Sequence, residues 1–251
     1  MLKKNNVLGV GVTCESEDDI LKYILWSLKG RVGKYFIVTP NPEIVVYANS
    51  HPEYKKILNE AKIALPDGVG VFLASALLGH SLKERITGVD FMEEICKRSV
   101  DQPIRVGFLG GGPGIAERTA ECLVGKYPYL NVVFSDSEWG RRGLNFSDKN
   151  QESRINNQGE KEMDILFVAF GAPKQEEWIY EHLEKLPVKV VMGVGGAFDY
   201  VSGNVGRAPF MVRAVGFEWL FRLVKQPWRW RRQLALPKFV WLVLRERFKR
   251  R

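Results

Sequence analysis

The chain has 251 residues, 45% of them hydrophobic, and a formal net charge of +8 at pH 7, so it is long and apolar enough to bury a full core. The longest apolar run near its C-terminus, Phe239–Leu244, is far shorter than the roughly 20 residues that span a bilayer. The three cysteines are isolated from each other and from the histidines, which argues against a disulfide framework and against a Cys/His zinc site.

The first residues, Met1–Thr13, contain two lysines and a short apolar run broken by glycine, and acidic residues follow them. This pattern fits no secretory signal. We therefore expect the protein to stay in the cytoplasm.

Apolar runs rich in β-branched residues recur along the chain and predict strands at Val7–Val12, Tyr35–Val38, Ile104–Leu109, Val132–Phe134, Ile165–Phe170 and Val188–Val194. Helical periodicity occupies intervening stretches at Ile20–Leu28, Val69–Leu78 and Ile115–Leu123. Strands that alternate with helices indicate an α/β fold, a Rossmann-like parallel sheet flanked by helices. In such sheets ligands bind beyond the carboxyl ends of the strands, so the residues after each strand are the candidate site residues.

Polar residues follow two of the early apolar runs. Thr39 and Asn41 come after Tyr35–Val38, where their side chains suit either turn formation or hydrogen bonds to a sugar. Asp67 precedes the helix expected from Val69, so it is either an N-cap or a general base that takes a proton from a hydroxyl nucleophile. The residues alone leave both choices open.

The glycine-rich turn Gly110–Gly114 follows a strand and opens a helix, so the backbone amides around Gly111 and Gly112 can hold a phosphate. A dinucleotide fingerprint would need glycine where Ile115 stands, and a tight turn without a ligand is the alternative. Asp136, after the next strand, stands where an acid accepts bonds from ribose hydroxyls. Asp136 and Glu138 form an acid-x-acid pair, but without a second carboxylate cluster we predict no metal site.

Gln175 lies where a helix should start after Pro173, and ordinary helix-start chemistry explains this segment. A contact between Gln175 and a ligand is the alternative. The polar stretch from Trp139 to Glu160 predicts a loop or connector.

The pattern changes after residue 206, and we expect a body at 1–206 and a basic, helical appendage at 207–251. The appendage holds thirteen of the 37 basic residues and two of the 29 acidic ones, with four tryptophans among them. Apolar spacing from Phe217 to Val224 predicts an amphipathic helix that ends by Pro227, and a second helix is expected near Pro237. Arginine beside tryptophan suits a lipid headgroup layer, or the stacked bases of a nucleic acid.

Six motifs in order along the chain resemble the WecG/TagA/CpsF glycosyltransferase family: Thr39-Pro-Asn-Pro42, Leu65-Pro-Asp-Gly-Val-Gly70, Arg85-Ile-Thr-Gly-Val-Asp90, Gly110-Gly-Gly-Pro-Gly114, Phe170-Gly-Ala-Pro-Lys-Gln-Glu176 and Gly193-Val-Gly-Gly-Ala-Phe-Asp199. The C-terminal stretches Glu218-Trp-Leu-Phe-Arg222 and Pro227-Trp-Arg-Trp-Arg-Arg232 are similar to the family's appendage.

The resemblance implies inverting, metal-independent transfer of an N-acetylmannosamine-type sugar from a UDP donor to N-acetylglucosamine on undecaprenyl diphosphate. The product would feed teichoic acid or another surface polysaccharide, with the enzyme peripheral at the inner face of the bacterial cell membrane and without a cofactor. Carried over residue by residue, Asp67 is the base. The remaining expected site residues are Thr39, Asn41, Arg85 and Gln175 in the pocket and Arg222, Arg229 and Arg232 from the appendage.

Two other functions compete with this expectation. An NAD-dependent oxidoreductase would use the glycine turn and Asp136, although the missing third glycine counts against it. A nucleic-acid-binding module would use the Arg/Trp tail. The body is near neutral and carries loops of the kind that bind small ligands, so we expect no nucleic acid partner. An apolar helix face on the appendage also leaves a homo-oligomer open.

Overall fold

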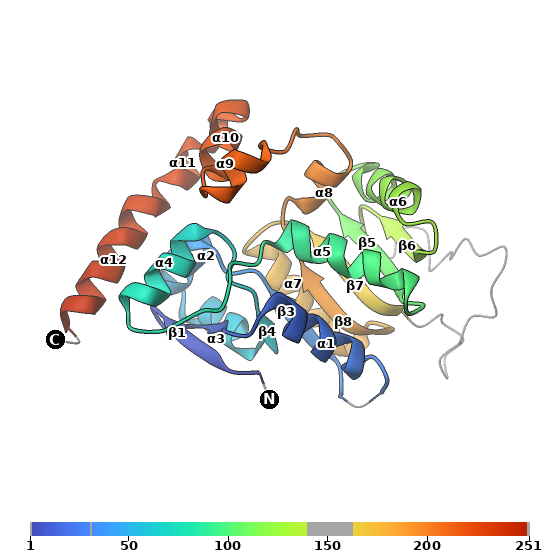
Figure 1. Cartoon of the computed structure of the whole chain (residues 1–251), viewed down its shortest axis with the longest axis horizontal. Helices are drawn as coiled ribbons and strands as arrows, with labels where there is room; N and C mark the ends of the chain where they lie inside the picture. Colours follow the sequence, from blue (N-terminus) through green and yellow to red (C-terminus); the bar gives the residue numbers. More distant parts are fainter. Residues whose placement is uncertain (1, 31, 140–162, 250–251) are drawn as a thin grey trace. The chain divides into compact units, whose positions relative to one another are not determined.

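The computed structural model describes residues 2–30, 32–139 and 163–249 (Figure 1). Apart from Trp139 itself, the predicted loop at Trp139–Glu160 lies outside the described residues. The chain divides into two compact units. The first unit comprises Met1–Glu17, Thr39–Thr87 and Val205–Arg251, and the second comprises Asp18–Val38 and Gly88–Asn204.

The second unit contributes five strands of a parallel sheet, which follow in the order β3-β8-β7-β5-β6. They are β3 (Tyr35–Val38), β5 (Arg105–Gly110), β6 (Asn131–Asp136), β7 (Met163–Ala169) and β8 (Val188–Gly193). Every residue of β3 and β7 is buried. Continuous burial explains why these strands read as unbroken apolar runs, and the predicted α/β class is confirmed.

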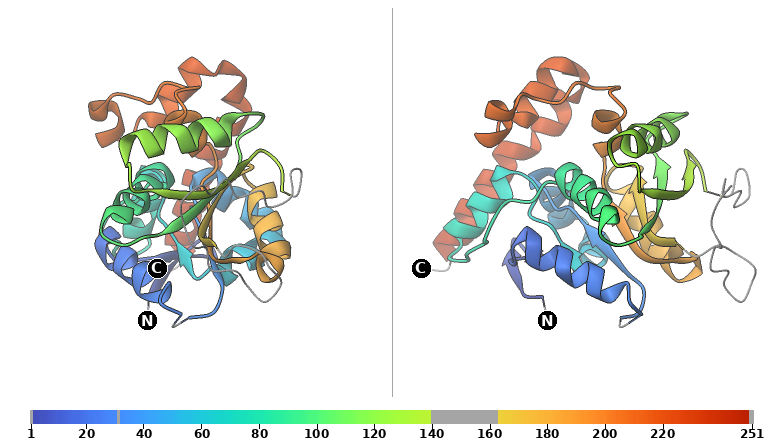
Figure 2. Two further views of the ribbon diagram at one scale, coloured as in Figure 1. Left: turned by 90° about the vertical axis from the view of Figure 1, so that its right-hand side faces the viewer. Right: turned by 45° about the vertical axis from the view of Figure 1, so that its right-hand side comes forward.

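The helices of the second unit are α1 (Glu17–Ser27), α5 (Gly88–Lys97), α6 (Ile115–Lys126), α7 (Lys174–His182) and α8 (Ala197–Val201), with the 3-10 turns η1 (Arg98–Val100) and η2 (Leu183–Lys185). Helix α6 packs on β5 and β6, and α7 packs on β3, β7 and β8 (Figure 2). Rings of Phe108 and Phe167 stack at 5.5 Å, and Phe198 of α8 meets Phe108 edge-on at 5.6 Å. This apolar core fixes the strand ends that carry the candidate site.

Two partly exposed cations surround a buried carboxylate near the starts of three strands. Asp164 accepts hydrogen bonds from the backbone N of Arg105 (2.9 Å), from its Nε (3.2 Å) and from Lys189 Nζ (3.1 Å). Burial by itself would raise the pKa of Asp164, but the hydrogen bonds and charge of Arg105, with the charge of Lys189, outweigh it and lower this pKa. The carboxylate therefore ties β5, β7 and β8 together.

The first unit begins with an antiparallel hairpin, β1 (Lys4–Val7) and β2 (Val10–Thr13). The prediction of one strand over Val7–Val12 is therefore wrong. Leu8 and Gly9 adopt φ values of 55° and 88°, and Asn6 Oδ1 accepts the Gly9 N–H at 2.8 Å. Positive φ at both central residues is the geometry of a two-residue hairpin turn, which reverses the chain in the middle of the apolar run.

The remaining elements of the first unit are α2 (Pro42–Ser50), α3 (Pro52–Glu60), β4 (Ile63–Ala64) and α4 (Val69–Leu77), followed by the C-terminal helices α9 (Phe210–Ala214), α10 (Glu218–Lys225), η3 (Pro227–Arg229), α11 (Trp230–Gln233) and α12 (Ala235–Lys249). The two helices predicted after residue 206 are confirmed as α10 and α12. Helix α12 packs against α2 and α4 (Figure 1). It buries Phe239, Leu242 and Val243 at helical spacing.

Candidate functional site

Backbone hydrogen bonds join three segments of the first unit that carry predicted site residues. Asp67 N donates to Pro40 O at 3.1 Å, which joins the Asp67 turn to the Thr39–Asn41 segment. Ile86 N donates to Pro66 O at 3.2 Å, which brings the segment of Arg85 to the same turn. These contacts bring together the segments of four predicted site residues, Thr39, Asn41, Asp67 and Arg85. The first and the last of them, at positions 39 and 85, are 46 positions apart in the chain.

Asn41 caps the N-terminus of α2. Its Oδ1 accepts a hydrogen bond from Ile44 N at 3.0 Å, and Pro42 occupies the first helical position. The turn-forming role of Asn41 is therefore confirmed, and its side-chain NH₂ has two donors for further partners. Thr39, two residues earlier, is buried with 6% of its surface exposed.

Asp67 is half-buried and stands one residue ahead of the helix cap. The N-cap of α4 is Gly68, whose φ of 84° favours glycine, and no side chain caps this helix. The alternative that Asp67 is the N-cap is therefore wrong. A Cβ on Gly70 would lie 2.5 Å from Pro42 Cγ, so the start of α4 packs tightly against the start of α2. The Asp67 turn is thereby fixed from both of its ends.

The C-terminal segment contacts this cluster directly. Arg85 Nη2 donates to Arg213 O at 3.1 Å, at the end of α9. Between α9 and α10, Gly216 has a φ of 83°, and a Cβ there would lie only 2.3 Å from Val69 Cγ2. Val69 is the first residue of α4, two positions after Asp67. The turn between α9 and α10 thus packs beside the candidate base.

Among the three predicted tail arginines, Arg232 has a partner near the cluster. Its Nε lies 2.5 Å from Glu43 Oε1, in the first turn of α2. Arg222 Nε donates at 3.3 Å to Oε1 of Gln226, the residue that caps the C-terminus of the same helix. Arg229 is the last residue of η3 and is half-buried. The structure thus brings Arg232 to the residues beside Asn41, and the other two arginines stand on neighbouring elements of the tail.

Gly111, Gly112 and Asp136 lie at strand ends of the second unit. Gly111 N donates to Ala169 O at 3.0 Å, and a Cβ there would lie 2.7 Å from Ile115 Cγ2. Gly112 is exposed, with a φ of 92°, and a Cβ added to it would have nothing within 4 Å. Asp136 pairs with Leu109 in register, is buried, and accepts Glu138 N at 3.2 Å through Oδ1. An open glycine turn and a carboxylate therefore end adjacent strands.

Gln175 is buried at the start of α7 and uses both ends of its amide within the protein. Its Oε1 accepts Gly195 N at 2.8 Å, and its Nε2 donates to Glu176 Oε1 at 2.8 Å. A Cβ on Gly193 would collide with this amide at 2.3 Å. Gln175 therefore ties the start of α7 to the loop after β8, and this contact shapes the ends of β7 and β8.

Sequence reasoning missed an aromatic cluster in the same unit. Phe134 lies 5.2 Å from Trp139, Trp139 lies 6.2 Å from Trp178, and Phe170 meets Trp178 edge-on at 5.4 Å, all measured between ring centroids. All four rings are partly exposed. Part of the signal was present in the chain, because Phe134 and Phe170 are the last residues of two predicted strands. The spacing of Trp139 and Trp178 gives no hint that their rings meet.

Glu43 and Gly216 were also missed. An acid in the first turn of a helix reads as ordinary dipole compensation, and a lone glycine between helices reads as a connector. Within residues 2–30, 32–139 and 163–249, no group of three or more His, Cys, Asp or Glu side chains is arranged to hold a metal ion. Over the same residues, no helix has the length and apolar character needed to cross a membrane.

Comparison with known proteins matches the chain to a family described as "Glycosyl transferase WecG/TagA/CpsF family", over residues 5–251. Relatives named N-acetylglucosaminyldiphosphoundecaprenol N-acetyl-beta-D-mannosaminyltransferase include one from Bacillus spizizenii, 36% identical over 84% of this chain and 79% of its own. The relative of that name from Bacillus subtilis is 34% identical over the same shares, and one from Staphylococcus aureus is 34% identical over 85% of this chain and 81% of its own.

Proposed function

Because the chain belongs to the WecG/TagA/CpsF family of glycosyl transferases, we propose that it moves an N-acetylmannosamine-type sugar from a UDP donor to N-acetylglucosamine linked to undecaprenyl diphosphate. The observation that carries this proposal is the likeness, over most of both chains, to relatives named for that acceptor and that sugar. Family membership also favours a glycosyltransferase over an oxidoreductase or a nucleic-acid-binding module.

The reaction we propose is a single in-line displacement. The acceptor hydroxyl oxygen forms a bond to the anomeric carbon as the bond from that carbon to the UDP oxygen breaks, which inverts the configuration. The hydroxyl proton passes to the Asp67 carboxylate, and UDP leaves with the bonding electron pair. Asp67 suits this role because its half-buried turn is held by Pro40, Pro42 and Gly216 through the contacts described above.

Positive charge must offset the charge that develops on the departing diphosphate. We assign this role to Arg222, Arg229 and Arg232, because guanidinium groups bind phosphate oxygens in a paired geometry. Arg232 already lies at the first turn of α2, beside Asn41. Because these side chains supply the charge, the proposed reaction needs no metal, and turnover should be unchanged after treatment with EDTA.

The donor nucleotide is assigned to the second unit. Backbone amides around Gly111 and Gly112 suit its phosphates, Asp136 suits ribose hydroxyls, and the partly exposed rings of Trp139 and Trp178 suit a planar base. Asp136→Asn should raise the KM for UDP-sugar more than it lowers kcat. An equal loss in an Asp101→Asn control, which changes an acid on an exposed turn, would remove this assignment.

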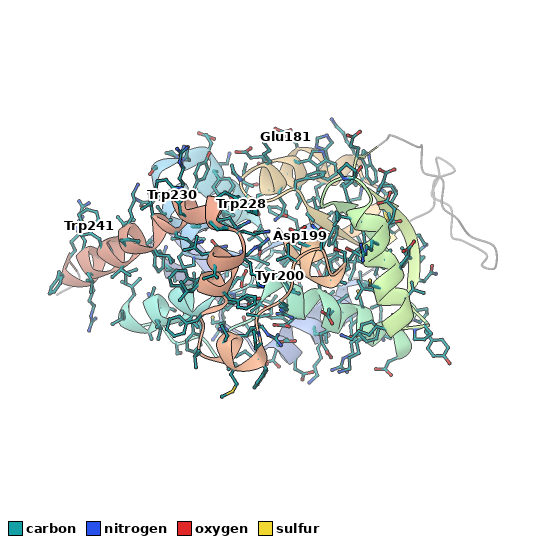
Figure 3. All side chains as sticks on the ribbon, turned by 90° about the horizontal axis from the view of Figure 1, so that it is seen from above. Glu181, Asp199, Tyr200, Trp228, Trp230 and Trp241 are labelled. Atoms are coloured by element: carbon teal, nitrogen blue, oxygen red, sulfur yellow. The ribbon has the colours of Figure 1, made fainter. Side chains whose placement is uncertain are left out.

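The tail supports a peripheral position at the membrane. Trp228, Trp230 and Trp241 are 71%, 53% and 57% exposed along η3, α11 and α12 (Figure 3). Arg231 lies over the Trp230 ring and Arg245 over the Trp241 ring, at 5.6 Å and 5.3 Å from the centroids. Amphipathic rings beside cations suit an anionic headgroup layer, which here would be the inner face of the cell membrane.

Asp67→Asn tests the central assignment. The variant keeps the size and shape of the side chain but removes the carboxylate that takes the proton, so release of UDP should fall by about 100-fold or more, in the range that general bases contribute. Binding of the UDP-sugar, measured by calorimetry, should stay near that of the unmodified protein. Full turnover by this variant, assayed with a lipid-diphosphate acceptor and a panel of UDP-sugars, would show that Asp67 is not the base.

A further inference from the structure

Apart from the buried Ser75, helix α4 is apolar on every side. Its sequence is VGVFLASAL, and no charged residue lies between Asp67 and Lys83. Val71, Ala74 and Ser75 are buried on its inner side. A helix that is apolar on every side is normally enclosed by protein or by lipid.

The outer side of α4 is not enclosed by the described residues of its unit. Leu73 and Leu77 are 55% and 52% exposed, and Ala76 between them is exposed as well. Positions four apart lie on the same face of a helix, so Leu73 and Leu77 form one stripe with Ala76 at its side. Two exposed leucines on one uncharged helix are unlike the scattered apolar residues of an ordinary water-facing surface.

This stripe belongs to the same compact unit as the tail. Helix α12 packs against α4, and Gly216 of the tail packs against Val69 at the start of α4. Beyond its buried residues, α12 exposes Trp241 and Leu244. The apolar face of α4 and the exposed tryptophans and arginines of the tail therefore belong to one compact unit.

The chemistry of these surfaces favours a lipid bilayer as the occupant. Uncharged leucines suit the hydrocarbon edge of a bilayer, whereas tryptophan and arginine suit its headgroups. The stretch from 68 to 82 contains no Asp, Glu, Lys or Arg with which a protein partner could set its register.

We propose that the outer face of α4, formed by Leu73, Ala76 and Leu77, rests in the hydrocarbon edge of the membrane. The proposal builds on the proposed function, because it concerns how a lipid-linked acceptor reaches Asp67. Leu73 and Leu77 lie about 6 Å and about 12 Å along the helix axis from Val69, at 1.5 Å per residue. Contact of this helix with lipid would hold the Asp67 turn at headgroup depth, where the diphosphate of the acceptor lies.

The test replaces both leucines by glutamine, which keeps helix propensity and removes the apolar stripe. Binding of the full chain is measured by co-sedimentation with vesicles of phosphatidylglycerol and phosphatidylethanolamine. Leu73→Gln/Leu77→Gln should lower the partition coefficient by about tenfold or more, since two apolar side chains no longer enter lipid. The control, Val124→Gln, changes an exposed apolar residue of α6 in the second unit and should leave binding unchanged.

Activity separates membrane contact from damage to the site. With an undecaprenyl acceptor embedded in vesicles, turnover of the double variant should fall in parallel with vesicle binding. With a water-soluble, short-chain acceptor, its turnover should equal that of the unmodified protein. A Leu73→Ala/Leu77→Ala variant retains part of the apolar surface and keeps the helix. Its vesicle binding should lie between that of the unmodified protein and that of the glutamine variant, and it serves as the test if the glutamine variant fails to fold.

Three results would overturn the proposal. Vesicle binding that is unchanged in both double variants would remove lipid as the occupant. A dimer in sedimentation that both double variants dissociate, with vesicle binding unaltered, would assign the face to a second copy of the chain. An equal loss of turnover on the soluble acceptor would make the leucines part of the site itself. If the unmodified protein transferred no sugar to any acceptor, the proposed function would fail, while the vesicle measurement would still judge the contact of α4.

Discussion

Substitution of Gly216 by alanine perturbs the contact between the tail and the start of α4. Gly216 has a φ of 83°, a conformation that L residues rarely adopt. The new Cβ would lie 2.3 Å from Val69 Cγ2 and 2.8 Å from Val69 Cβ, well inside van der Waals contact. Either the turn between α9 and α10 or the first residue of α4 must therefore move.

Two costs add in this variant. The left-handed conformation costs an L residue about 1–2 kcal/mol. Forcing an extra carbon into a packed contact costs about 1–3 kcal/mol more. Gly79→Ala supplies the matched control. Gly79 follows helix α4 and has a φ of 84°, but a Cβ added to it would have nothing within 4 Å. The control should show only the conformational cost, so the difference between the two variants measures the contact with Val69.

Urea denaturation, followed by circular dichroism, gives both free energies of unfolding. Gly216→Ala should be less stable than Gly79→Ala by about 1–3 kcal/mol. Val69→Ala removes Cγ1 and Cγ2 but keeps Cβ, so adding it to Gly216→Ala should restore part of that difference. Turnover should fall further in Gly216→Ala than in Gly79→Ala, since Val69 is two residues from Asp67. Equal stability of the two glycine variants, or no recovery with Val69→Ala, would refute the reasoning.

Three further outcomes follow from named contacts. Asp164→Asn should lower the free energy of unfolding by about 1.5–3 kcal/mol at pH 7, because it removes the charged acceptor of the hydrogen bonds from the partly buried Arg105. The pKa of Asp164 is lowered in the folded state. The difference in unfolding free energy between the unmodified protein and Asp164→Asn should therefore keep its whole size above the unfolded pKa of about 4 and disappear as pH falls through the folded pKa. Urea titrations at several pH values would show this dependence. Asn41→Ala should cost about 1 kcal/mol as a lost cap, whereas Asn41→Asp should keep the stability, so a loss of turnover in the latter would assign the amide to a ligand. Glu43→Gln and Arg232→Gln remove the same half-exposed ion pair and should each change stability by no more than about 1 kcal/mol; if Arg232 also meets diphosphate, only its variant should lose most of its turnover in the UDP-release assay.

Much of the α/β body could be predicted because parallel strands buried on both faces leave unbroken apolar runs. Tyr35–Val38 is predicted and observed with the same bounds, and Val188–Val194 ends one residue beyond the observed β8. The run Val7–Val12 led to the wrong element because its turn residues, Leu8 and Gly9, are not the asparagine, aspartate or glycine pair that marks such turns. Periodicity reports burial along the chain and says little about a reversal inside an apolar run.

The site was predictable to the extent that it lies in loops after strands. Thr39, Asn41 and Asp67 follow from that rule, and the backbone hydrogen bond between Asp67 and Pro40 joins them. The role of Gly216 could not be predicted, since it depends on the tail returning to α4 from more than 140 residues away in the chain, from position 69 to position 216. Packing of this kind leaves no periodic signal, because a single glycine suffices for a close approach.

The packing of α12 changes how the tail must be tested. Phe239, Leu242 and Val243 are buried, and the helix contacts α2 and α4, so deleting the tail would expose apolar surface on the two helices that flank the Asp67 turn. Loss of activity after such a deletion would follow from destabilisation alone and would say nothing about lipid. Replacing Trp241, which is exposed on the same helix, leaves the buried contacts intact. Trp241→Ser should therefore weaken vesicle binding without changing the free energy of unfolding, whereas Leu242→Ser should lower that free energy first. If the two substitutions changed both quantities alike, docking and folding would not be separable on this helix.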